Sequence, residues 1–160
     1  MMLFYLIASI LAASAAFAAR NERQIAAAGA AFYAVQAVFV LCIFAGGLYG
    51  TDSLGVFSFD AAGMLFHILL VVVSAFAFAH SEAYLHGSDL RQTRTYSALL
   101  MLLTTAISGA YFASNLAVTW IFLEATTLCS AGIIYHRRTA QTLEAAWKYV
   151  FVCSTGIAMA

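Results

Sequence analysis

Long apolar stretches separated by short polar connections make up most of the chain. A helix needs about 20 apolar residues to cross the hydrocarbon core of a bilayer. Six stretches come near or reach that length: residues 2–19, 25–48, 61–85, 96–113, 116–135 and 143–160. The pattern therefore predicts an all-α fold, a polytopic membrane bundle of six transmembrane helices that form a single region over residues 1–160.

The composition supports a membrane protein and excludes several other classes. Of the 160 residues, 64% are hydrophobic and 9% are charged, whereas a soluble domain carries roughly 25% charged residues. The net charge is zero, so no basic surface is expected for nucleic acid. Cys42, Cys129 and Cys153 lie in apolar runs without metal-ligand spacing, which indicates small buried residues. No positive charge precedes the first stretch, and this favours a membrane helix over a cleaved signal peptide.

The basic residues predict the orientation of the chain in the membrane. Six of the seven follow the first, third or fifth apolar stretch: Arg20, Arg23, Arg91, Arg94, Arg137 and Arg138. The connections after the second and fourth stretches contain no Lys or Arg. Because positive residues concentrate on the cytoplasmic side, we expect the odd-numbered connections in the cytoplasm and the N-terminus outside. The expected location is the cell inner membrane.

One acidic residue, Glu124, stands near the middle of the fifth stretch, in "TWIFLEATTLCSAG". An ionised acid at the centre of a bilayer costs roughly 2.5–3.5 kcal/mol, and such residues are usually functional. Burial favours the neutral form of a carboxyl group, which would allow proton uptake and release near neutral pH. Two interpretations stay open: a group that carries protons in translocation, or a protonated side chain that only hydrogen-bonds a neighbouring helix.

Lys148, in the sixth stretch, is the natural local partner of Glu124. The short connection "HRRTAQT" predicts an antiparallel hairpin of the fifth and sixth helices. In that hairpin the two residues differ in depth by about 8 Å, within the combined reach of both side chains. The alternative is that Lys148 pairs with Glu144 four residues earlier, or extends to the membrane surface.

Two histidines on the third stretch raise separate hypotheses. His80, near the cytoplasmic end, is a candidate for proton uptake because an imidazole titrates near pH 6.5; a structural, hydrogen-bonded histidine is the alternative. His67 lies about 220° away around the same helix, so the pair does not predict a metal site. No phosphate-binding loop or nucleophile motif is present. We therefore predict no catalytic residue, no metal and no cofactor in this chain.

The segment "SNLAVTWIFLEATTLCSAGIIYHRRTAQTLEAAWKYVFVCSTGIAMA" resembles a known family. The family comprises the antiporter-like membrane subunits of respiratory complex I, of Mrp cation/proton antiporters and of group 4 membrane-bound hydrogenases. "WIFLEATTL" and "LEAAWKY" are most similar to component F of the hydrogenase-4 and formate hydrogenlyase branch. "FDAAGMLFHILLVVVSAF" and "HSEAYLHG" are similar to the family's third helix and its exit, so the resemblance covers about residues 55–160.

The resemblance implies a role for individual residues. Glu124 matches the family's helix-5 glutamate, which pairs with a lysine on helix 7, and Lys148 matches the lysine that opens helix 6. The chain would be the N-terminal part of a larger antiporter-like fold, truncated before helix 7. The partner lysine would then lie beyond residue 160.

The resemblance also implies a function. The chain would belong to a proton-translocating, non-catalytic subunit of a membrane-bound hydrogenase or complex I-like oxidoreductase. It would couple electron transfer in partner subunits to proton movement. Its partners would be other membrane subunits and peripheral hydrogenase or dehydrogenase subunits that hold nickel-iron, iron–sulfur or flavin centres. The alternatives are a subunit of an Mrp-type cation/proton antiporter and a non-conducting structural membrane anchor.

Overall fold

The structure, a computed structural model, describes residues 2–46, 50–51, 55–85 and 89–159. This described part contains six α-helices: α1 (Met2–Ala18), α2 (Glu22–Gly46), α3 (Ala61–Tyr84), α4 (Leu90–Phe112), α5 (Leu116–Ile134) and α6 (Ala140–Met159). A short 3₁₀ helix, η1 (Tyr135–Arg137), and two strands, β1 (Gly50–Thr51) and β2 (Ser58–Phe59), lie in the connections. The predicted all-α fold is confirmed.

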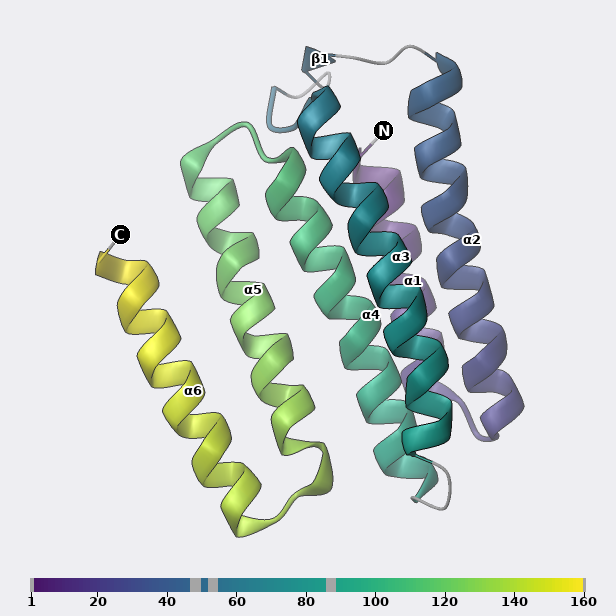
Figure 1. Ribbon diagram of the computed structural model, residues 1–160, viewed down its shortest axis with the longest axis vertical. Coiled ribbons are helices and arrows are strands. Elements are labelled where there is room, and N and C mark those ends of the chain that lie inside the picture. The colour runs from purple at the N-terminus through teal and green to yellow at the C-terminus, as the bar shows by residue number, and fades with distance from the viewer. Residues whose placement is uncertain (1, 47–49, 52–54, 86–88, 160) are drawn as a thin grey trace.

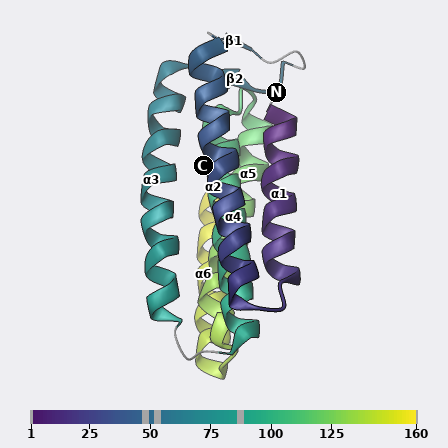
Figure 2. The ribbon, with the colours of Figure 1, turned by 90° about the vertical axis from the view of Figure 1, so that its right-hand side faces the viewer.

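The helices run up and down along a common axis (Figure 1). Helix α4 is central, because it packs against α1, α3 and α5. Figure 2 shows α1 and α3 on opposite sides, with α2 and α4 between them. Helix α5 lies beside α4, and α6 packs against the far side of α5 at the edge of the bundle (Figure 1).

Four helices of the described chain are long and apolar enough to cross a membrane, and they indicate a membrane protein. These spans are Glu22–Ala45, Ala61–Ser81, Leu90–Phe112 and Leu116–Arg137. Helix α1 is apolar but has only 17 residues. Helix α6 has 20 residues, yet it carries Glu144 and Lys148 among several polar positions. Four of the six predicted spans thus have the length and the apolar composition that crossing a membrane requires.

Three helices begin earlier than the apolar pattern predicts. Helix α2 begins at Glu22, α4 at Leu90 and α6 at Ala140, whereas the apolar stretches begin at residues 25, 96 and 143. The difference arises because Glu, Arg and Gln are good helix formers, so a helix can continue past the end of its apolar segment. As a consequence, Arg91 and Arg94 lie in the first turns of α4.

Side-chain caps fix where α3 and α5 begin. Oδ1 of Asp60 accepts a hydrogen bond from the backbone N–H of Gly63 at 3.1 Å. Oδ1 of Asn115 accepts one from the backbone N–H of Ala117 at 2.9 Å. Asp and Asn are among the preferred residues at this position because their oxygens satisfy the free N–H groups of the first turn.

The connection after α2 is tied to the connection after α4. Strands β1 and β2 pair antiparallel, with Gly50 opposite Phe59, and Phe57 bridges to Ala113. The backbone N–H of Ser114 donates to the carbonyl of Val56 at 2.9 Å. Both connections therefore lie at the same end of the bundle.

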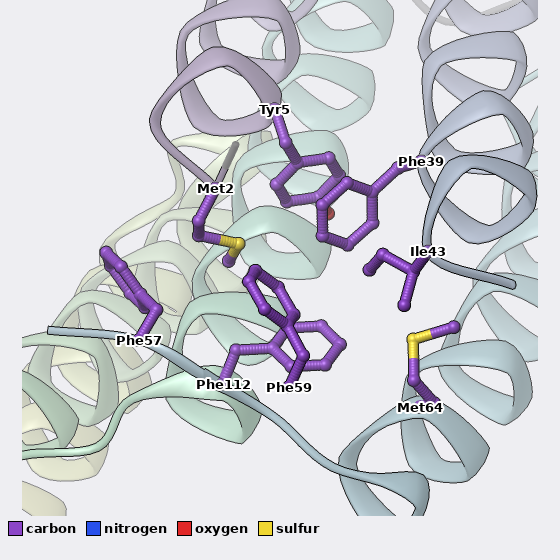
Figure 3. Packing of buried hydrophobic residues seen from close by; sticks show 8 residues of the cluster. All are labelled: Met2, Tyr5, Phe39, Ile43, Phe57, Phe59, Met64 and Phe112. Atoms are coloured by element: carbon purple, nitrogen blue, oxygen red, sulfur yellow. The ribbon is translucent and has the colours of Figure 1, made fainter. Parts of the chain in front are cut away.

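A cluster of large apolar side chains fills the bundle beneath this end (Figure 3). Its buried members are Met2, Tyr5, Phe39, Ile43, Phe57, Phe59, Met64 and Phe112. A second cluster lies nearer the opposite end and is built largely from alanines: Ala13, Ala16, Ala28, Phe32, Phe78, Ala98, Leu100 and Met101. Together these clusters hold α1 to α4 as a packed unit to which α5 and α6 attach.

Candidate functional site

Glu124 lies at the middle of α5 and is half-buried; α5 itself packs against α4 and α6. Its Oε1 atom accepts a hydrogen bond from Oγ of Ser154 on α6 at 2.5 Å. The carboxyl group is thus held by a neighbouring helix.

A tight turn makes this contact possible by reversing the chain. Arg138, after η1, adopts a left-handed conformation with φ 53°. Thr139 and Thr142 then exchange hydrogen bonds: the N–H of Thr139 donates to Oγ1 of Thr142 at 2.9 Å, and the N–H of Thr142 donates to Oγ1 of Thr139 at 3.1 Å. This arrangement starts α6 antiparallel to α5, so Ser154 reaches the depth of Glu124.

The interface between α5 and α6 is otherwise mostly apolar. Toward the turn, the two helices border a shallow groove of about 250 Å³ whose lining includes Ala131, Gly132, Ala146 and Val150. Between these two helices, the contact of Glu124 with Ser154 is a polar link beside an apolar groove. Polar groups placed in this way inside a membrane usually have a functional role.

On its other side α5 packs closely against α4. A Cβ atom added to Gly109 of α4 would lie 2.3 Å from the ring of Phe122, and one added to Gly132 of α5 would lie 2.8 Å from Leu99. Buried hydroxyl groups on α4 bond to their own helix: Oγ1 of Thr104 donates to the carbonyl of Leu100 at 2.9 Å. The partner that the structure gives to Glu124 therefore comes from α6.

Lys148 lies elsewhere on α6. Its Nζ atom donates to Oε1 of Glu144 at 2.5 Å, and the two side chains are 74% and 67% exposed. Lys148 precedes Ser154 by six residues, so the two project from faces about 120° apart. The structure thus places Lys148 in the i,i+4 pair and does not bring it to Glu124. Its part in proton translocation stays a prediction.

His80 is an exposed residue near the end of α3, the end from which the chain continues toward Arg91 and Arg94. The structure does not bring it into the contact of Glu124 with Ser154. Proton uptake through His80 also stays a prediction.

The burial of the cysteines differs in part from the prediction. Cys42 is exposed, and Cys129 and Cys153 are half-buried. The expectation of a buried residue was wrong for Cys42, because lipid can replace protein around an apolar side chain in a membrane. Among the residues that the structure describes, no group of three or more His, Cys, Asp or Glu side chains could hold a metal ion.

Ser154 was not foreseen as part of the site, although the sequence held a signal for it. Glu124 precedes the predicted end of the fifth helix, residue 135, by eleven residues, or about 16 Å, and the same depth is reached about eleven residues along the sixth helix. Counting from its predicted start at residue 143 leads to Ser154. A charged residue in an apolar run predicts a partner more directly than depth does, so the sequence favoured Lys148.

Replacing Ser154 with Ala is expected to remove the only described hydrogen bond to Glu124 and to lower the free energy of unfolding by about 1 kcal/mol. At a pH low enough to protonate Glu124, the infrared carbonyl band of its carboxyl group should shift to higher wavenumber, because the carbonyl loses a hydrogen bond. Thr155→Ala is the matched control, because Oγ1 of Thr155 donates to its own helix at the carbonyl of Phe151. An unchanged carbonyl band in the Ser154→Ala protein would contradict the contact.

The geometry defines an all-α membrane protein with a carboxyl group held between two helices, and two curated relatives resemble it. Over 67 residues, the chain is 31% identical to "Hydrogenase-4 component F homolog" of Methylacidiphilum infernorum, covering 42% of this chain and 14% of that protein. Over 145 residues, it is 26% identical to "NADH-quinone oxidoreductase subunit N" of Acinetobacter baumannii, covering 88% of this chain and 28% of that protein.

These similarities support the predicted resemblance at a coarse level only. The matched regions span 14% and 28% of the relatives' own lengths. No family model matches the chain, and no solved structure matches it. The chain is thus similar to one hydrogenase component and to one NADH-quinone oxidoreductase subunit.

Proposed function

We propose that this chain is part of a proton-translocating membrane subunit of a membrane-bound hydrogenase or complex I-like oxidoreductase. The observation that carries the proposal is the carboxyl group of Glu124, at the middle of a membrane-spanning helix and bonded to Ser154 of the next helix. The names of the two relatives support a subunit of this kind, and they favour it over an Mrp-type antiporter.

In this proposal Glu124 takes up and releases the transported proton. The hydroxyl of Ser154 can donate a hydrogen bond to the ionised carboxylate and accept one from the protonated form, so the contact survives a change of charge. An approaching cation would favour the ionised form of the acid and its withdrawal would favour the neutral form. A lysine of a further helix, or Lys148 after release from Glu144, would supply that cation.

Electron transfer would take place in partner subunits. Nickel-iron, iron–sulfur or flavin centres there would supply the redox chemistry, and this chain would contribute charge movement without bond-making catalysis.

The proposed orientation places the N-terminus outside and the odd-numbered connections in the cytoplasm. The ties between the connections after α2 and α4 support it, since both of these connections lack Lys and Arg. The basic residues at the opposite end would then face the cytoplasmic side of the inner membrane.

The proposal is tested with the complete oxidoreductase complex in proteoliposomes that contain a pH-sensitive dye. Adding electron donor should change the internal pH, and an uncoupler should abolish that change. Electron transfer without any proton movement would contradict the proposal. Proton movement that requires a sodium gradient and no electron donor would favour the antiporter instead.

Lys148→Gln is expected to slow proton translocation several-fold, whereas Glu144→Gln should leave it nearly unchanged. Lys148→Gln removes a cation that would favour the ionised form of Glu124. Glu144 does not act on Glu124 in this proposal, and the exposed pair that it forms with Lys148 contributes little to stability. Both variants are measured in the proteoliposome assay. Equal losses in the two variants would indicate that the pair itself, and not the lysine, matters.

A further inference from the structure

Four helices contribute fully buried polar side chains to one region of the bundle, remote in sequence from Glu124. Ser9 of α1, Gln36 of α2, His67 of α3 and Ser108 of α4 each have 0% exposure. The hydroxyl of Tyr5 on α1 donates to Oε1 of Gln36 at 2.8 Å. This region adjoins the apolar cluster of Figure 3, in which Tyr5 and Phe39 are drawn.

His67 is surrounded by aromatic rings. The centroid of its ring lies 5.9 Å from that of Tyr5, 5.5 Å from that of Phe39 and 5.5 Å from that of Phe112. Within the described residues, neither Nδ1 nor Nε2 of His67 has a hydrogen-bond partner. A neutral imidazole carries one hydrogen-bond donor and one acceptor, so His67 has an unsatisfied donor and an unsatisfied acceptor in the protein interior.

Two further buried polar atoms close to Tyr5 also lack a hydrogen-bond partner. Nε2 of Gln36 and Oγ of Ser9 are buried without a hydrogen-bond partner in the described part of the chain. Gln36 is bonded to Tyr5 through its other atom, and Ser9 follows Tyr5 by four residues, on the same face of α1. Ser9, Gln36 and His67 are thus all neighbours of Tyr5: Gln36 at its hydroxyl, His67 at its ring and Ser9 one helical turn along α1.

The chemistry of these groups selects the ligand. Buried polar atoms in proteins are almost always satisfied by other protein groups or by ordered water, and a buried water typically makes about three hydrogen bonds. The set consists of neutral donors and acceptors and contains no carboxylate, whereas Ca²⁺ and Mg²⁺ require several oxygen ligands. We propose that Ser9, Gln36 and His67 form an internal water-binding site beside Tyr5, between α1, α2 and α3.

The site is separate from the contact of Glu124 with Ser154, and it does not depend on the proposed function. Water bound there would complete the hydrogen bonds of His67 on one or both ring nitrogens. It would also link α1, α2 and α3 through a polar network above an apolar core.

The test is X-ray radiolytic labelling of the intact protein in lipid nanodiscs, in which hydroxyl radicals formed from bound water oxidise adjacent side chains. Phe39 and Phe32 form a matched pair, since both are buried aromatic residues of α2, at 4% and 0% exposure. Phe39 adjoins the proposed site, whereas Phe32 lies in the second, alanine-rich cluster. We expect Phe39 and Tyr5 to be labelled several-fold faster than Phe32.

Equal labelling of Phe39 and Phe32 in the unmodified protein would overturn the proposal, and this comparison needs no variant. In His67→Phe, the labelling of Phe39 should fall to the rate of Phe32. Ser9→Ala should also lower it, whereas the control Ser14→Ala, at an exposed position of α1, should not. Undiminished labelling of Phe39 in a folded His67→Phe protein would show that His67 does not hold the water.

Discussion

Proton translocation is expected to fall about tenfold or more when Glu124 is replaced with Gln, since a positioned acid or base typically contributes a factor of this size or larger. The substitution keeps the length of the side chain, and its amide oxygen can still accept the hydrogen bond from Ser154. What it removes is the ability to bind and release a proton. The measurement is dye-reported internal pH in proteoliposomes that contain the complete complex.

Glu144→Gln is the matched control for this experiment, because it makes the same change at an exposed carboxylate of α6. Assembly of each variant is checked by the amount of complex recovered from the membrane. Translocation at the unmodified rate in an assembled Glu124→Gln complex would refute the role of Glu124. It would favour the structural membrane anchor instead.

Gly109→Leu is expected to lower the free energy of unfolding by about 1–3 kcal/mol, the usual cost of overfilling a packed interior. A Cβ atom at this position would meet three atoms of the Phe122 ring at 2.3–2.6 Å. That ring has little room to move, because it also packs against Phe57 with centroids 6.1 Å apart. Unfolding by sodium dodecyl sulfate in mixed micelles provides the measurement.

Gly156→Leu is the matched control, since among the residues that the structure describes no atom outside the adjoining backbone of α6 lies within 4 Å of a Cβ atom added at Gly156. In an α-helix, replacing Gly with Leu normally stabilises by several tenths of a kcal/mol, so this control should be neutral or slightly more stable. Similar losses in both variants would mean that the contact between α4 and α5 does not depend on the small residue at Gly109.

The helices and their antiparallel hairpin could be predicted because the sequence records them locally. Apolar runs of sufficient length and short polar connections are enough to predict helices, and Asp60 and Asn115 are recognisable caps. The predicted starts of α2, α4 and α6 were less accurate, because the change from polar to apolar residues marks where the apolar segment begins and not where the helix begins. Glu124 could be singled out because a lone charge in an apolar run is conspicuous.

The partners of the polar residues could not be predicted in the same way. Whether Lys148 turns toward Glu124 or toward Glu144 depends on helix rotation, and hydropathy alone does not determine it. His67 shares no face with His80, so the sequence predicted no metal site there; the structure places it beside Tyr5 and Phe39, which belong to other helices. Such encounters between distant segments arise from packing, and a single sequence does not display them.

The tie between Ser114 and the carbonyls of Val56 and Gly55 anchors the start of α5 to the connection that precedes α3. A rigid rod held at one end moves least there and progressively more along its length. Glu124 lies ten residues beyond Ser114, about 15 Å along the helix axis, so a slight tilt of α5 about this anchor would shift its carboxyl group sideways.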